Sequence, residues 1–155
     1  MKINVMQLGP QMVLGMRKIG PYKEIPNMIM EIYRYAQSKN IHVSGPPIFL
    51  CRECSIETVK EADKKGSADL EIAWPISVKA KGTGKIKCYE LPGGRFAHIT
   101  HRGPYEECEP TYNKLFAWIK KNKLEITGPI REIYPNDPNE VKQEDILTEI
   151  YAPIK

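Results

Sequence analysis

Two glutamates and two tyrosines have the spacing of a small chemical site. Glu132 and Tyr134 are two residues apart, and Glu149 and Tyr151 are two apart near the end of the chain. If both segments are strands, side-chain alternation places each pair on one face of a sheet. We therefore expect the four side chains to form one acidic and aromatic patch.

Such a patch favours binding of a flat lipophilic cation. Aromatic faces attract cations, and a carboxylate in a low-dielectric cleft adds Coulomb attraction. The same carboxylate could take part in catalysis, because burial raises the pKa of a carboxylic acid and suits it to general acid or base chemistry. The alternative is that Glu132 and Glu149 are solvated strand residues paired with Arg131 or nearby lysines. Spacing alone does not decide between these interpretations.

The elements that must position these residues recur along the chain. Gly20-Pro21-Tyr22 reappears as Gly103-Pro104-Tyr105, and Gly45 and Gly128 are separated by the same offset. Several motifs at one offset indicate an internal duplication. The chain is therefore expected to contain two copies of one structural unit.

We expect a single domain over residues 1–155, with a first β-β-α-β-β unit over about 1–80 and a second over about 84–155. The first copy carries five extra residues, for which the polar stretch 61–67 is the natural place. Strands are expected near residues 3–8, 12–19, 48–53, 70–76, 86–91, 95–101, 130–134 and 148–154.

One amphipathic helix is expected in each copy, after the Gly-Pro-Tyr triplet. Apolar residues recur there at helical spacing. They are Ile25, Ile29, Ile32, Tyr33 and Ala36 in the first copy and Cys108, Tyr112, Leu115, Phe116 and Ile119 in the second. The expected fold is α+β, with an antiparallel eight-stranded sheet, two helices on one face and a central cleft on the other.

The two copies differ at one informative position. Phe49 in the first copy occupies the place of Glu132 in the second, so one half has a ring where the other has a carboxylate. This asymmetry indicates a specialised site. Trp74 fits a wall of the cleft as well as a core role.

Composition argues against several classes of protein. Hydrophobic residues make up 41% and charged residues 27%, the balance of a soluble globular chain. No apolar run approaches the roughly 20 residues of a membrane span, and no signal peptide is visible, so we expect a cytoplasmic protein without membrane contact. The net charge of +4 comes from lysines and arginines scattered among acids, so direct nucleic-acid binding is not expected.

Cysteine and histidine spacing predicts neither a metal site nor a cofactor. Cys51-Arg52-Glu53-Cys54 has metal-ligand or redox spacing, but no second such pair accompanies it, so structural thiols are favoured. His98 and His101 are three residues apart on an expected strand and should point to opposite faces, which argues against joint ligation.

Three features resemble the GyrI-like small-molecule-binding family. They are the Gly-Pro-Tyr-Glu start of the second helix, the stretch 126–138 and the ending 148–154. This family also supplies the effector-binding domains of AraC-type and MerR-type multidrug regulators, and the similarity extends over essentially the whole chain. It implies a duplicated fold whose central cleft binds ligands through Glu132, with Glu149 and Tyr151 lining the cleft.

The resemblance implies a stand-alone protein that binds amphipathic cationic organic molecules between the two repeats. The expected ligand-binding residues are Glu132, Tyr134, Glu149, Tyr151, Phe49 and Trp74. One alternative is a hydrolase of small electrophilic toxins of the cyclopropanoid type, with Glu132 as general base. Another is a protein-interaction module that modulates gyrase or a regulator, so a protein partner stays open. Because no DNA-binding region is visible, a direct transcription-factor role is not expected.

Overall fold

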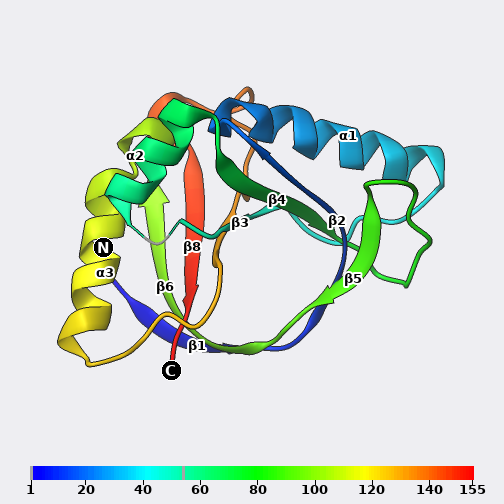
Figure 1. Ribbon diagram of the computed structural model, residues 1–155. Coiled ribbons are helices and arrows are strands. Elements are labelled where there is room, and N and C mark those ends of the chain that lie inside the picture. Colours follow the sequence, from blue (N-terminus) through cyan, green and yellow to red (C-terminus); the bar gives the residue numbers. More distant parts are fainter. Residues whose placement is uncertain (1, 54) are drawn as a thin grey trace.

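The computed structural model describes residues 2–53 and 55–155 (Figure 1). In these two ranges the chain forms one sheet of eight antiparallel strands and three α-helices. The predicted α+β class and the eight-stranded sheet are confirmed. No helix in the same ranges is long and apolar enough to cross a lipid bilayer.

The two halves of the chain have the same order of elements, apart from one helix. The first half contains β1 (Asn4–Leu8), β2 (Gln11–Gly20), α1 (Ile25–Ser38), β3 (Ile48–Cys51), α2 (Ile56–Lys65) and β4 (Ala68–Pro75). The second contains β5 (Lys87–Leu91), β6 (Gly94–Arg102), α3 (Glu109–Lys121), β7 (Ile130–Ile133) and β8 (Leu147–Pro153). The 3-10 turns η1 (Tyr22–Glu24), η2 (Tyr105–Glu107) and η3 (Gln143–Asp145) precede α1, α3 and β8.

The strand order places the two halves side by side. The order is β1-β6-β8-β7-β3-β4-β2-β5. Strand β1 of the first half lies at one edge beside three strands of the second half, and β5 of the second half lies at the other edge beside three strands of the first. β3 and β7 pair at the centre of the sheet, where Phe49 lies directly opposite Glu132. The junction between the halves is therefore a strand pair.

The sheet has two faces with different coverings. On one face lies the main core, in which α1 packs on β4 and β2 and α3 packs on β6. The other face carries a smaller apolar cluster, made of Val13, Ile48, Leu50, Ala73 and Leu91. Figure 1 shows that the sheet is curled, with α1 and α3 at its outside.

Helix α2 departs from the prediction of two helices. The Ser55 side chain caps its first turn by accepting a hydrogen bond from the Thr58 N–H at 3.1 Å, and Gly66 ends it with a φ of 63°. We expected only a polar insertion here. A serine cap, lysines in the last turn and a following glycine are helix signals that the sequence does contain.

Candidate ligand pocket

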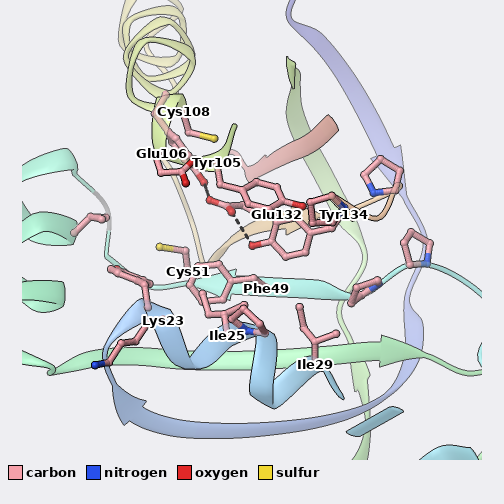
Figure 2. Close-up of a pocket in the computed structure, with 18 of the residues that line it drawn as sticks. Lys23, Ile25, Ile29, Phe49, Cys51, Tyr105, Glu106, Cys108, Glu132 and Tyr134 are labelled. Atoms are coloured by element: carbon pink, nitrogen blue, oxygen red, sulfur yellow. Dashed lines mark hydrogen bonds between the residues drawn. The ribbon is translucent and has the colours of Figure 1, made fainter. Parts of the chain in front are cut away.

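A cavity of about 1100 Å³ lies between α1 and α3, over the junction of β3 and β7 (Figure 2). It is on the face of the sheet that the helices flank, whereas the sequence placed the cleft on the opposite face. The physical reason is that α1 packs on β4 and β2 while α3 packs on β6, so the two helices lie on either side of the central pair β3 and β7. The centre of the same face is therefore left open.

The apolar stripe of each main helix divides between core and cavity. In α1, Ile32 and Ala36 are fully buried against the sheet, whereas Ile29 and Tyr33 line the cavity. The second helix repeats this division: Leu115 and Ile119 are buried, and Tyr112 and Phe116 face the cavity. Part of the apolar stripe of each helix packs against the sheet, and the remaining part forms a wall of the cavity.

Glu132 lies on the cavity floor and is held by two tyrosines. Its Oε1 accepts the Tyr134 hydroxyl at 2.9 Å, and its Oε2 accepts the Tyr112 hydroxyl (Figure 2). Burial raises the pKa of Glu132, while the two hydrogen bonds and the nearby His101 act in the opposite direction. Burial also raises the pKa of both tyrosines, so their hydroxyls stay protonated and donate to the carboxylate.

Aromatic rings line the cavity in pairs. The pairs are Tyr105 with Tyr134, Tyr22 with Phe49, and Tyr33 with Trp74, whose ring centroids lie 5.3, 6.0 and 5.0 Å apart. The Trp74 indole N–H donates to the Ile29 carbonyl at 2.9 Å, which fixes this ring against α1. Fixed rings provide flat apolar and cation-attracting surface at little entropic cost.

The cavity is acidic in a basic protein. Its charged lining residues are Glu53, Glu106, Glu109, Glu132, Asp137, Lys23 and Lys60. Lys60 is paired with Glu109, with 3.2 Å between Nζ and Oε2. Because the whole chain has a net charge of +4, this excess of acids favours cations at the cavity over the rest of the surface.

Comparison with known proteins identifies the family. The sequence model of the GyrI-like small molecule binding domain matches residues 1–155. The chain belongs to this family. No curated protein sequence gives a significant match.

Solved structures share the fold of this GyrI-like domain at low sequence identity. The EcmrR C-terminal domain has a TM-score of 0.86 and 18% identity, over 99% of this chain and 97% of that one. EcmrR in its DNA complex gives the same score and identity, but the GyrI-like domain spans 57% of that chain.

Two further structural neighbours are a hydrolase and a protein with a bound ligand. A hydrolase encoded by lin2189 from Listeria innocua has a TM-score of 0.68 and 16% identity, over 99% of this chain and 92% of that one. SAV2435 bound to tetraphenylphosphonium has a TM-score of 0.65 and 12% identity, over 100% and 94%. At such identities the likeness concerns the fold.

The GyrI-like domain brings together four of the six predicted site residues and separates the other two. Phe49, Trp74, Glu132 and Tyr134 line the cavity. Glu132 pairs in register with Ile150, so these two side chains lie on the same face of the sheet. Glu149 and Tyr151 flank Ile150 in the strand, and side-chain alternation therefore directs them to the opposite face. The expectation of one four-residue patch is therefore wrong.

Glu149 and Tyr151 take part in a separate cluster on that opposite face. The Glu149 carboxylate pairs with the His98 ring and accepts the Thr100 hydroxyl at 2.8 Å. The Tyr151 ring lies 4.6 Å from the His98 ring. His101 points the other way and contacts the Thr111 hydroxyl at 2.8 Å, so the two histidines do lie on opposite faces.

Tyr112 is the site residue that sequence reasoning placed only in an apolar stripe. It occupies the position in the second half that Ile29 holds in the first. The sequence signal was a tyrosine at an inward-facing position of an apolar stripe. A buried hydroxyl needs a hydrogen-bond partner, so this tyrosine indicated a polar group in the cavity. The partner is Glu132.

The cavity thiols are protonated. Burial, with a smaller contribution from Glu132, raises the pKa of Cys51 and of Cys108 to about 12. Because the thiolate is the reactive form, neither side chain is a strong nucleophile at neutral pH. Cys54, the other member of the Cys-x-x-Cys segment, lies outside the described residues.

Proposed function

We propose that this domain binds lipophilic organic cations in the cavity between α1 and α3, with Glu132 as the anionic anchor. Small-molecule binding is the property of the family to which the chain belongs. The observation that supports a cation is an ionisable carboxylate on the floor of an aromatic-walled cavity. About 1100 Å³ is slightly larger than the ~300–1,000 Å³ typical of pockets for drug-sized ligands.

The energetics of Glu132 favour a positively charged ligand. Burial makes the ionised carboxylate unfavourable in the empty cavity, which is why its pKa is raised. A bound cation compensates the ionised carboxylate in a medium of low dielectric constant, and the aromatic rings attract the same charge. An anion of equal size would meet repulsion from the carboxylate.

A pair of ligands with the same shape and opposite charge tests this function. Tetraphenylphosphonium is the ligand named for the structural neighbour SAV2435, and tetraphenylborate is its anionic counterpart. Calorimetric titration should show binding of the phosphonium at least about tenfold tighter than of the borate, a difference of about 1.4 kcal/mol. Glu132→Gln should remove most of that preference.

The matched control is Glu57→Gln, which removes the same charge from the exposed first turn of α2 outside the cavity. It should leave the affinity for the phosphonium within about twofold, because exposed charges are screened by solvent and salt. Equal binding of the two ions, or an unchanged preference in Glu132→Gln, would refute the proposal.

Hydrolysis is the second candidate function, and the raised pKa of Glu132 is the observation that favours it. A raised pKa makes a carboxylate a stronger base, which favours general-base catalysis. We rank binding first because both oxygens of Glu132 accept tyrosine hydrogens, which makes the carboxylate less basic. Product formation from an electrophilic cyclopropane-containing compound, lost in Glu132→Gln, would support hydrolysis. Stoichiometric binding without product would exclude it for that compound.

A further inference from the structure

The cavity contains a second oriented carboxylate, that of Glu53. This residue follows β3 and lines the same cavity as Glu132. Its Oε1 accepts the Tyr22 hydroxyl at 2.6 Å, and its Oε2 accepts the Asp69 backbone N–H at 3.4 Å. Two donors from different elements therefore hold this carboxylate in place.

The neighbouring basic side chains are directed elsewhere. Arg52, the preceding residue, is paired with Glu71 on the opposite face of the sheet, with 2.6 Å between Nη2 and Oε1. Lys60 is paired with Glu109. Figure 2 shows the exposed Lys23 with its amino group turned away from the other labelled side chains. The Tyr22 hydroxyl and the Asp69 backbone N–H, which donate to the Glu53 carboxylate, are both neutral, and the Glu53 side chain lines the cavity.

The two carboxylates occupy different positions in the cavity. Glu132 pairs with Phe49 inside β3, whereas Glu53 lies two residues beyond Cys51, where β3 ends. Glu132 accepts hydrogen bonds from Tyr112 and Tyr134, and Glu53 accepts them from Tyr22 and Asp69, so the two groups share no donor. The rings of Phe49 and Tyr22 line the wall between them, with centroids 6.0 Å apart.

The second half of the chain offers no matching charge at the equivalent position. Asn136 occupies the place of Glu53 in the repeat, and it also lines the cavity. Its side-chain amide nitrogen donates to the Asp145 carbonyl at 2.9 Å, so this neutral residue is engaged with its own loop. Glu53 therefore has no charged counterpart at the equivalent position of the second half.

We infer that the cavity selects dications in which a hydrophobic spacer separates two positive centres, one placed at Glu132 and the other at Glu53. This inference rests on the proposed binding of cations and adds the ligand class. Each centre would meet one carboxylate and adjacent aromatic rings, and the spacer would lie along the apolar wall. A single-headed cation of the same chain length would use only one carboxylate.

Decamethonium and decyltrimethylammonium test the inference, because they share a ten-carbon chain and differ by one quaternary ammonium group. We expect calorimetry to show decamethonium binding at least about tenfold tighter than the single-headed ligand, equivalent to about 1.4 kcal/mol. Glu53→Gln, which keeps an oxygen acceptor for Tyr22, should bring the two affinities within about twofold. Glu53→Asp keeps the charge and should retain part of the preference.

The control is again Glu57→Gln, which should keep the full preference for the dication. Circular dichroism and retained binding of the single-headed ligand would show that each variant is folded. Equal affinities of the wild type for the two ligands, or equal effects of Glu53→Gln and Glu57→Gln, would overturn the inference while leaving the proposed cation binding intact. Failure of both ligands and of tetraphenylphosphonium to bind would reject the proposed function, and the inference with it.

Discussion

Phe49 and Glu132 are direct partners in the pairing of β3 with β7, at the centre of the sheet. They also lie on corresponding strands of the two halves, since β3 follows α1 and β7 follows α3. A ring and a carboxylate therefore meet at the junction of the halves, on the floor of one cavity. Only the carboxylate needs polar partners, and Tyr112 and Tyr134 supply them. The two halves therefore contribute different chemical groups to the cavity floor, a ring from β3 and a carboxylate from β7, although both strands follow the main helix of their half.

Cation affinity should fall as the pH falls through the pKa of Glu132. Burial raises this pKa, so the loss should begin at a higher pH than for an exposed carboxylate. Since a bound cation favours the ionised form, binding should release a proton wherever free Glu132 is protonated. Titration of tetraphenylphosphonium in buffers of different ionisation enthalpy measures both effects. An affinity that stays constant down to pH 4.5, the ordinary value for glutamate, would speak against this role.

Glu132→Gln should stabilise the empty protein above neutral pH. The folded-state pKa lies above the unfolded value, so folded Glu132 holds its proton more tightly, and its contribution to stability is lost as the pH rises through the folded pKa. The neutral amide avoids this loss. We expect the melting temperature to be higher than that of the wild type at pH 8 and to be nearly unchanged at pH 4. A lower melting temperature at pH 8 would show that the ionised carboxylate stabilises the fold.

Tyr112→Phe should raise the pKa of Glu132 further and weaken cation binding at pH values around that pKa. The substitution removes one of the hydrogen bonds that favour the ionised carboxylate. An effect of about fivefold in affinity is expected from the loss of a hydrogen bond to a charged group, and it should shrink as the pH rises above the pKa of Glu132. Tyr35→Phe is the control, because the Tyr35 hydroxyl donates to the Lys81 carbonyl outside the cavity. Identical pH profiles of the two variants would argue against the proposed hydrogen-bond effect.

Glu149→Gln should leave the affinity for tetraphenylphosphonium within about twofold of the wild type, because its carboxylate lies on the face of the sheet opposite the cavity. Glu149 contacts His98 and Thr100 on the face opposite the cavity. Calorimetric titration alongside Glu132→Gln checks this assignment. A loss as large as that of Glu132→Gln would mean that ligand binds on the other face of the sheet.

Gly15→Ala should destabilise the fold by about 1–3 kcal/mol. A Cβ at this position would overlap the Tyr89 hydroxyl oxygen and would lie 2.9 Å from the Ile72 carbonyl oxygen, so both would have to move. Gly9→Ala is the matched control, because a Cβ there meets nothing within 4 Å. Urea denaturation of the two variants measures the difference. Equal stabilities would show that the strand accommodates the methyl group.

Sequence patterns predicted the strands and the two main helices because those elements have strong local periodicity. The same periodicity could not place the cavity, since its position depends on how α1 and α3 are spaced over the sheet. Periodicity shows which side chains of one strand share a face, but it does not show which faces of two different strands coincide, so Glu149 was grouped with Glu132. The register between paired strands decides which faces coincide, and it is set by the pairing of β7 with β8.

Helix α2 shows a different limit. Its capping residues were present in the sequence, but a short polar helix without a fully buried residue has little hydrophobic periodicity. The position of Phe49, in contrast, was predictable from the sequence. Its place in the repeat implied equivalence to Glu132, and the structure puts both on the cavity floor.

A crystal structure of the protein with tetraphenylphosphonium would locate the bound cation. We expect the cation between α1 and α3, with its phenyl rings against the aromatic walls and its positive centre near the Glu132 carboxylate. Density for the ligand on the opposite face, near Glu149 and Tyr151, with the cavity free of ligand, would show that the cavity is not the binding site.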